Sequence, residues 1–477
     1  MSRRDEEALA WAEQHLDGRI VNVERQVRWR PHYVLDVESA GGGRRHVLLR
    51  GYRNPGYTTP DEAGARAMLA SEAAVLRALK SVPVAAPEFL GYNGELGWLL
   101  MEYIAGEAEL TAIEDSDRRF TIYTGYVEEL AKLHAFPLAD IDLDPMLLRP
   151  ASAKAFKQDL LDRHEAYFRG ADLRYPEPVM EMGFRWLRAN ELPSERPVCL
   201  CLTDVGPNQF LFQGDQFGAF IDVEYGMVGD PLMEIGMMRG RDVTYHSGRM
   251  TEHIRHYGKA YEQLTGIALD IGALQYWTVA GPTLWNVFAL PAAQHPDPTT
   301  IDTAFMLSYE VQQKRCILEG LAEWHGIHLE TPALPEADPM QLGSLHEALA
   351  GQFEHYWPTR VADPQDAVFA QYSKAIADTL ARGEATALSI GTDNKDELAE
   401  LLGHRPNDWN AGLAELQARI SKDYERDLEP TLNFLHRTEL RREFLYEPMQ
   451  RATGVSVRRL MQRFDHQLAK PKGGQRQ

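Results

Sequence analysis

The chain has 477 residues, of which 44% are hydrophobic and 25% charged, as in ordinary globular proteins and unlike collagen-like or disordered chains. This length suggests two or three domains, each with its own core. Lys and Arg number 50 against 70 Asp and Glu, so the formal net charge is −20. Such a surface repels phosphate backbones and anionic lipid, which argues against a nucleic-acid or membrane partner.

The cysteines and the N-terminus indicate the compartment. Three cysteines, Cys199, Cys201 and Cys316, are too few for a disulfide scaffold, and no CxxC pair is present. The first residues become acidic at once and contain no apolar segment of the signal-peptide type. No uninterrupted apolar run approaches the roughly 18 residues of a membrane span. We therefore expect a reduced, cytoplasmic protein.

Residues 1–104 alternate between strand-like and helix-like patterns. The β-rich runs 33–37 and 46–50 flank a glycine-rich turn and predict a hairpin. Apolar positions at helical spacing predict a helix over 61–80, and 97–104 form another strand-like run. We expect a small α+β lobe here.

Residues 105–335 predict a second, mainly helical lobe, interrupted by three short apolar runs between 197 and 224. The proline-rich stretch 326–343 predicts a domain boundary. Beyond it we expect a C-terminal helical domain over 336–477, which is the candidate surface for a homo-oligomer. Its helices are expected at 344–357, 365–382, 395–403, 408–438 and 440–466.

Glu72 lies on the apolar face of the first predicted long helix, between Leu69 and Leu76. A buried carboxylate needs a cationic partner, and Arg50, at the end of a predicted strand, is the natural candidate. We expect an Arg50–Glu72 ion pair that faces the cleft between the lobes. The alternative is that Glu72 sits at the edge of its helix and reaches solvent.

Two aspartates each follow an apolar strand. Asp204 follows the run 198–202, Asp222 follows 219–221, and a hairpin separates them, so the two acids can converge on one side of a small sheet. Such partly desolvated acids suit a general base and a metal ligand. The amide of Gln209 can supply a neutral oxygen to the same ion, and oxygen ligands suit Mg²⁺. The alternative is that both aspartates only cap turns.

Several segments, in this order along the chain, resemble the phosphotransferase enzyme family, which includes aminoglycoside phosphotransferases and choline kinases. The resemblance covers about residues 20–325 and implies a two-lobed, protein-kinase-like α+β fold, to which this chain adds the C-terminal helical domain. The segments that carry it are Leu99 to Gly106, Leu130 to His134, Leu202-Thr203-Asp204, Phe220 to Glu224 and Gly229-Asp230-Pro231.

The resemblance also implies an ATP- and Mg²⁺-dependent enzyme that phosphorylates a hydroxyl group of a small molecule. Asp204 would then be the catalytic base, and Asp222 and Gln209 would hold the metal. Arg50, positioned by Glu72, would bind the phosphates that are not transferred. The adenine would be bound through backbone groups of the inter-lobe hinge, at Met101, Glu102 and Tyr103.

The chain departs from the family pattern at three of these positions. Leu202 replaces a histidine, Gln209 an asparagine and Arg50 a lysine, and no GxGxxG precedes Arg50. A catalytically inactive, kinase-like binding or scaffold protein therefore stays open as the alternative function. The acceptor is also open between a hydroxyacyl-CoA, which would need a basic site, and an aminoglycoside-like compound, which would favour an acidic one.

Overall fold

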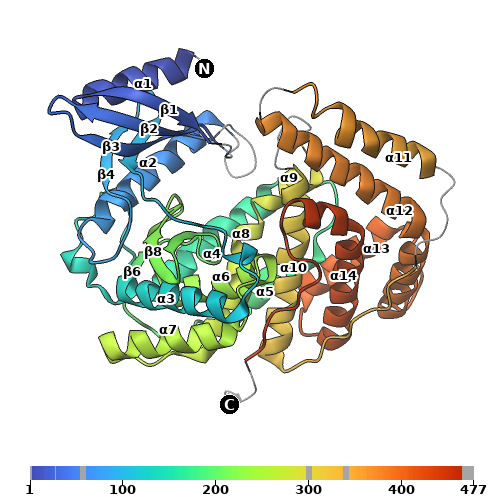
Figure 1. The fold of residues 1–477 in the computed structure, drawn as a ribbon. Coiled ribbons are helices and arrows are strands. Elements are labelled where there is room, and N and C mark those ends of the chain that lie inside the picture. The colour runs from blue at the N-terminus through green and yellow to red at the C-terminus, as the bar shows by residue number, and fades with distance from the viewer. Residues whose placement is uncertain are drawn as a thin grey trace.

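The computed structural model describes residues 3–26, 28, 30–53, 61–296, 303–336, 343–361 and 364–464. A small first lobe stands above a mainly helical second lobe, and the C-terminal helices lie beside them (Figure 1). The predicted two-lobed α+β architecture with further C-terminal helices is confirmed. Among the described residues, no helix is both long and apolar enough to cross a bilayer.

The first lobe is an antiparallel five-stranded sheet in the order β1-β2-β3-β5-β4. The predicted hairpin is β2–β3, in which Leu35 pairs with Val47. β3 also pairs with β5, which places Arg50 opposite Leu99 at the end of the sheet that faces the second lobe. The elements are α1 (Arg3–Leu16), β1 (Gly18–Arg25), β2 (His32–Ser39), β3 (Arg44–Gly51), α2 (Glu62–Leu79), β4 (Phe89–Asn93) and β5 (Trp98–Glu102).

Helix α2 begins where the side chain of Asp61 accepts a 2.8 Å hydrogen bond from the backbone nitrogen of Gly64, an ordinary N-cap. Its apolar face packs into the core of the molecule through Leu69 and Leu76. Glu72 lies on that face and is only 1% exposed. The alternative in which Glu72 reaches solvent is therefore wrong.

The second lobe contains two small antiparallel sheets, β6 with β9 and β7 with β8, set among helices. The predicted hairpin between the two aspartates is β7–β8, and it turns at residues 213–216. The elements are α3 (Ser116–Ala135), α4 (Ala153–Gly170), α5 (Pro178–Ala189), β6 (Cys199–Cys201), β7 (Phe210–Gln213), β8 (Gln216–Phe220), β9 (Met227–Gly229), α6 (Pro231–Thr244), α7 (Met250–Thr265), α8 (Ile271–Asn286), α9 (Ala289–Gln294) and α10 (Thr303–His325).

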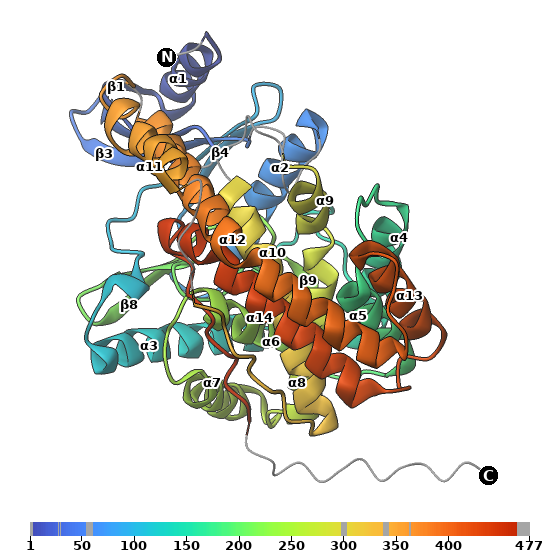
Figure 2. The same ribbon diagram turned by 90° about the vertical axis from the view of Figure 1, so that its right-hand side faces the viewer.

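The C-terminal helices differ from the expected ones in three places. The last helix, expected to reach residue 466, ends at Ala452, because Gly454 in a left-handed conformation closes it. The helices expected at 365–382 and 395–403 are one continuous helix, because packing of α12 along α14 outweighs the low helix propensity of Gly383 and Gly391 (Figure 2). The break expected near 439 lies at 423–427 instead. The elements are α11 (Gly343–Gly351), a π-helical turn (Gln352–Tyr356), α12 (Pro364–Leu402), α13 (Trp409–Lys422) and α14 (Leu428–Ala452).

These helices share one hydrophobic core with the second lobe, to which Leu398, Leu416 and Phe434 contribute. A buried ion pair also joins them, since Arg315 on α10 contacts Glu443 on α14 at 3.0 Å, with both side chains 0% exposed. The prediction that residues 336–477 form a separate domain, able to fold on its own, stays a prediction.

Replacing Arg315 with Met should lower the free energy of unfolding by about 3–5 kcal/mol, because Glu443 would stay buried without its cation. Urea unfolding followed by circular dichroism measures this difference. The matched control is Arg163→Met, which breaks a pair that is 61% and 60% exposed and should change stability by less than about 0.5 kcal/mol. Equal stability of the two variants would contradict the importance of the buried pair.

Candidate functional site

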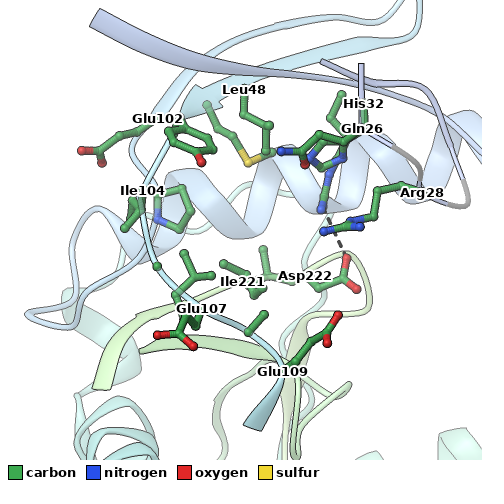
Figure 3. A pocket seen from close by; sticks show the side chains of 18 of the residues that line it. Gln26, Arg28, His32, Leu48, Glu102, Ile104, Glu107, Glu109, Ile221 and Asp222 are labelled. Carbon is green, nitrogen blue, oxygen red and sulfur yellow. Dashed lines mark hydrogen bonds and ion pairs between the residues drawn. The ribbon is translucent and has the colours of Figure 1, made fainter. Parts of the chain in front are cut away.

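A cavity of about 760 Å³ lies between the two lobes (Figure 3). Leu48 and His32 enter it from the sheet of the first lobe, and Ile221 and Asp222 enter from the second lobe. All the residues that the sequence predicts to bind a nucleotide line this cavity. Their roles in nucleotide binding stay predictions. These residues are Arg50, Glu72, Met101, Glu102 and Tyr103.

The cavity is lined by apolar and by charged side chains, and the acids Glu107 and Glu114 are among the charged ones. Leu48, Met101 and Ile221 line the part next to the segment that joins the lobes. Arg50 and Asp222 line the other part. Apolar side chains for a base together with charged groups for its phosphates are what a nucleotide needs.

The predicted ion pair between Arg50 and Glu72 is confirmed, and it faces this cavity. The structure adds a second cation, since Arg30 Nη1 lies 3.2 Å from Glu72 Oε2. The sequence did not pair Arg30 with Glu72, because no periodic pattern around Arg30 places its side chain on a known face. Glu72 therefore orients two guanidinium groups toward the part of the cavity that Asp222 lines.

Asp222 follows β8 with a φ of 58°, a left-handed backbone conformation that is uncommon for residues other than glycine. Its Oδ1 atom lies 3.3 Å from Arg30 Nη2 and 3.4 Å from Arg50 Nη1. Burial alone would raise the pKa of this carboxyl, but Arg50 and Arg30 outweigh burial and lower the pKa to about 2. Asp222 is therefore ionised at neutral pH.

Asp204 is held by two groups of the second lobe. Its Oδ1 atom forms an ion pair with Arg241 on α6, and its Oδ2 atom accepts a 2.6 Å hydrogen bond from Gln209 Nε2. Burial raises the pKa of Asp204 to about 6, Arg241 opposes this rise, and the charge of Asp222 adds to it. The charge effect shows that the two acids influence each other, but Asp204 does not line either of the two cavities that Asp222 lines, so their convergence on one cleft stays a prediction.

The two neighbouring amides, Asn208 and Gln209, differ in what they face. Gln209 is 8% exposed and directs its amide nitrogen to Asp204. Asn208 lines a second cavity together with Asp222, and its Oδ1 atom is buried without a hydrogen-bond partner. An unpartnered amide oxygen beside an ionised carboxylate fits a small divalent cation with oxygen ligands. Asn208 is thus a candidate metal ligand, whereas the alignment of the family motif with this sequence pointed to its neighbour Gln209. The role of Gln209 as a metal ligand stays a prediction.

Arg53 and Glu224 complete the charged cluster. Glu224 is buried between Arg30 and Arg53, with Arg53 Nη2 at 2.7 Å. Four arginines thus pair with four carboxylates in this cluster of described residues, and Arg28 also lines both cavities. The members of the cluster are Arg30, Arg50, Arg53, Arg241, Glu72, Asp204, Asp222 and Glu224.

A separate group of candidate metal ligands lies in the core of the second lobe. His134, Cys199 and Cys201 are buried close to one another. Both ring nitrogens of His134 already have partners, at 2.8 Å from Tyr257 Oη and at 2.5 Å from Glu234 Oε2. Burial raises the pKa of both thiols, so they are protonated. This group is a satisfied part of the core.

Residues 35–267 match the model of the phosphotransferase enzyme family, APH. Among solved structures, a Ralstonia eutropha JMP134 protein described provisionally as an aminoglycoside phosphotransferase is 17% identical, with a TM-score of 0.51 over 66% of this chain and 96% of its own. A macrolide 2'-phosphotransferase type I is 15% identical, with a TM-score of 0.46 over 66% and 98%. Choline kinase LicA of Streptococcus pneumoniae is 14% identical, with a TM-score of 0.46 over 67% and 99%. No curated protein matches the chain at a significant level.

The two lobes therefore have the protein-kinase-like fold of phosphotransferases. Residues 35–267 are a domain of the phosphotransferase enzyme family, and the general reaction class is phosphoryl transfer. The family and the fold that the motifs predicted are both confirmed.

The carboxyl of Asp204 should titrate near pH 6, above the ordinary value for aspartate, because it is buried. The difference between infrared titrations of the wild type and of Asp204→Asn measures this pKa. In Arg241→Ala the pKa should rise further, since a cation that favours the charged form is lost. A titration near pH 4, or a pKa that falls in Arg241→Ala, would contradict the burial and pairing described above.

Proposed function

We propose that the chain is an ATP- and Mg²⁺-dependent kinase that transfers the γ-phosphoryl group to a hydroxyl group of a small molecule. The observation that carries the proposal is the continuity of one cleft. Met101, Arg50, Glu72 and Asp222 line one cavity, the Arg50–Glu72 pair contacts Asp222, and the charge of Asp222 acts on Asp204. A base pocket, a phosphate clamp and two acids in sequence are what phosphoryl transfer requires.

In this mechanism Asp204 orients the acceptor hydroxyl and takes its proton as the new bond to phosphorus forms. The pKa of about 6 leaves Asp204 mostly ionised at neutral pH and basic enough to accept a proton. Arg241 fixes one carboxylate oxygen and Gln209 the other, so the side chain loses little freedom when the acceptor binds.

The non-transferred phosphates lie among the guanidinium groups of the first lobe. Arg50 is held by Glu72 and can bind phosphate oxygens through its planar fork, which differs from the point charge of lysine. Asp222 would hold Mg²⁺ together with the amide oxygen of Gln209 or of Asn208. When bound, this ion supplies positive charge that neutralises the nucleotide phosphates.

The charge of the cleft favours one class of acceptor. Its phosphate end is lined by Arg28, Arg30, Arg50 and Arg53 against Glu109 and Asp222. Arginines suit an acceptor that carries phosphate or carboxylate, as a hydroxyacyl-CoA does, better than a polycation such as an aminoglycoside. The acids Glu107 and Glu114 lie instead in the larger cavity, toward the segment that joins the lobes.

The second candidate function is nucleotide binding without catalysis, as in a kinase-like scaffold. The observation in its favour is that both aspartates are already neutralised, Asp204 by Arg241 and Asp222 by Arg30 and Arg50. In this case Mg²⁺ would not strengthen nucleotide binding, because no free carboxylate charge would receive it. Calorimetric titration with ATP in the presence and absence of Mg²⁺ separates the two functions.

Replacing each aspartate with asparagine should separate binding from catalysis. Asp222→Asn should weaken the binding of Mg-ATP, because a charged metal ligand is lost. Asp204→Asn should bind Mg-ATP nearly as the wild type does and lower kcat by about 10²–10⁴-fold, because its role is in the transition state. Calorimetry measures binding, and a screen of hydroxylated metabolites and acyl-CoAs for ATP-dependent phosphorylation supplies the acceptor for kcat.

The matched control is Asp159→Asn on the surface of α4, where the side chain is 60% exposed, and it should change neither quantity. Wild-type binding of Mg-ATP by Asp222→Asn would overturn the metal assignment. Full turnover by Asp204→Asn would place the chemistry on another residue.

A further inference from the structure

A second cavity of about 420 Å³ adjoins the first one. The two cavities share lining residues, among them Arg50 and Asp222. The second cavity therefore opens on the side to which the last phosphate of a nucleotide would point. Its remaining wall is formed by residues from several distant parts of the chain, which are Arg30, Arg53, Thr111, Asn208, Tyr245, Thr453 and Gly454.

Thr453 and Gly454 stand at the end of α14, far beyond residue 267, where the match to the family domain ends. The helix end is closed by Gly454, which has a φ of 73°, and by a 2.9 Å hydrogen bond from Val455 N to Gln450 O. The wall that these residues form is thus an addition of this chain to the family domain.

The segment that follows α14 is fastened to α6. Ser456 N donates a 2.9 Å hydrogen bond to Thr244 O, and Arg239 Nη2 donates a 2.9 Å bond to Gln462 O. Arg459 lies 3.4 Å from Asp242 between these two bonds. The three contacts lie on both sides of Arg241, the partner of Asp204. The C-terminal segment therefore has a fixed position relative to the proposed catalytic base.

A further contact holds the segment against α10. Gln312 Nε2 donates a 2.6 Å hydrogen bond to Ser456 O, and Phe464 N donates a 2.8 Å bond to Glu323 Oε1. Glu323 is itself buried and paired with Arg239 at 2.7 Å. A helix end held from two sides keeps its place when a ligand enters, as a binding wall must.

We propose that the end of α14 forms the acceptor end of the cleft and that Thr453 is a specificity-determining residue that contacts the acceptor. This inference rests on the proposed function. The space for an acceptor beside Asp222 is bounded by the side chain of Thr453 and by Gly454. At Gly454 an added Cβ would meet no atom within 4 Å, so the cavity is open there. A larger side chain at residue 453 fills that space without touching the nucleotide cavity.

The test compares two nucleotides that differ in how far they extend beyond the transferred phosphate. ADP ends within the nucleotide cavity, whereas diadenosine pentaphosphate must continue into the second cavity. Thr453→Trp should bind Mg-ADP as the wild type does and should lose at least tenfold in affinity for diadenosine pentaphosphate, both measured by calorimetry. The control is Thr392→Trp on an exposed part of α12, which should bind both nucleotides as the wild type does.

Two outcomes would overturn the inference while the proposed function stands. In one, Thr453→Trp binds both nucleotides with wild-type affinity. In the other, the wild type binds Mg-ADP and not diadenosine pentaphosphate, because the cavities would then not be continuous. A wild type that binds neither nucleotide overturns the proposed function, and the inference falls with it.

A second variant keeps the test independent of folding. Thr453→Cys can be modified after folding with a bulky maleimide, because the native cysteines Cys199, Cys201 and Cys316 are all buried. The modified variant should show the same selective loss of diadenosine pentaphosphate. Unchanged affinity for both nucleotides after complete modification would overturn the inference.

Discussion

The buried charge cluster between the lobes is the constraint on which the rest of the site depends. Arg30 of the first lobe contacts Glu72 of its own lobe and also Asp222 and Glu224 of the second lobe. Separating the lobes would break the ion pairs that Arg30, Arg50 and Arg53 of the first lobe make with Asp222 and Glu224 of the second lobe. The cluster therefore fixes how the two lobes face each other and holds the cleft between them in one shape.

The pairing of charges in this cluster also limits what can enter the cleft. A triphosphate brings negative charge to arginines that already have partners, so its binding must rearrange ion pairs instead of filling an empty cationic site. Asp222 and the unpartnered oxygen of Asn208 then become available to a divalent cation. Of the three departures from the family pattern, the one at Arg50 exchanges one cation for another and keeps the pair with Glu72.

The C-terminal helices are part of this arrangement. α14 shares the core of the second lobe, buries Glu443 against Arg315, and ends beside Asp222 and Asn208. The segment after it is hydrogen-bonded to α6, which carries Arg241. A shift in the position of α14 would therefore move α6, whose Arg241 pairs with Asp204. Stability of the helical part and geometry of the site are coupled in this protein.

Features that depend on local physics could be predicted from the amino-acid sequence. The pairing of Arg50 with Glu72 could be predicted because a carboxylate on an apolar helix face needs a cation, and the aspartates could be placed because each one ends an apolar strand. Tertiary structure alone decided the contacts of Arg30, Arg241 and Thr453, because pairing between distant, irregular segments leaves no periodic pattern in the sequence. Tertiary packing also keeps α12 helical at its two glycines, Gly383 and Gly391, because the packing energy exceeds their low intrinsic helix propensity.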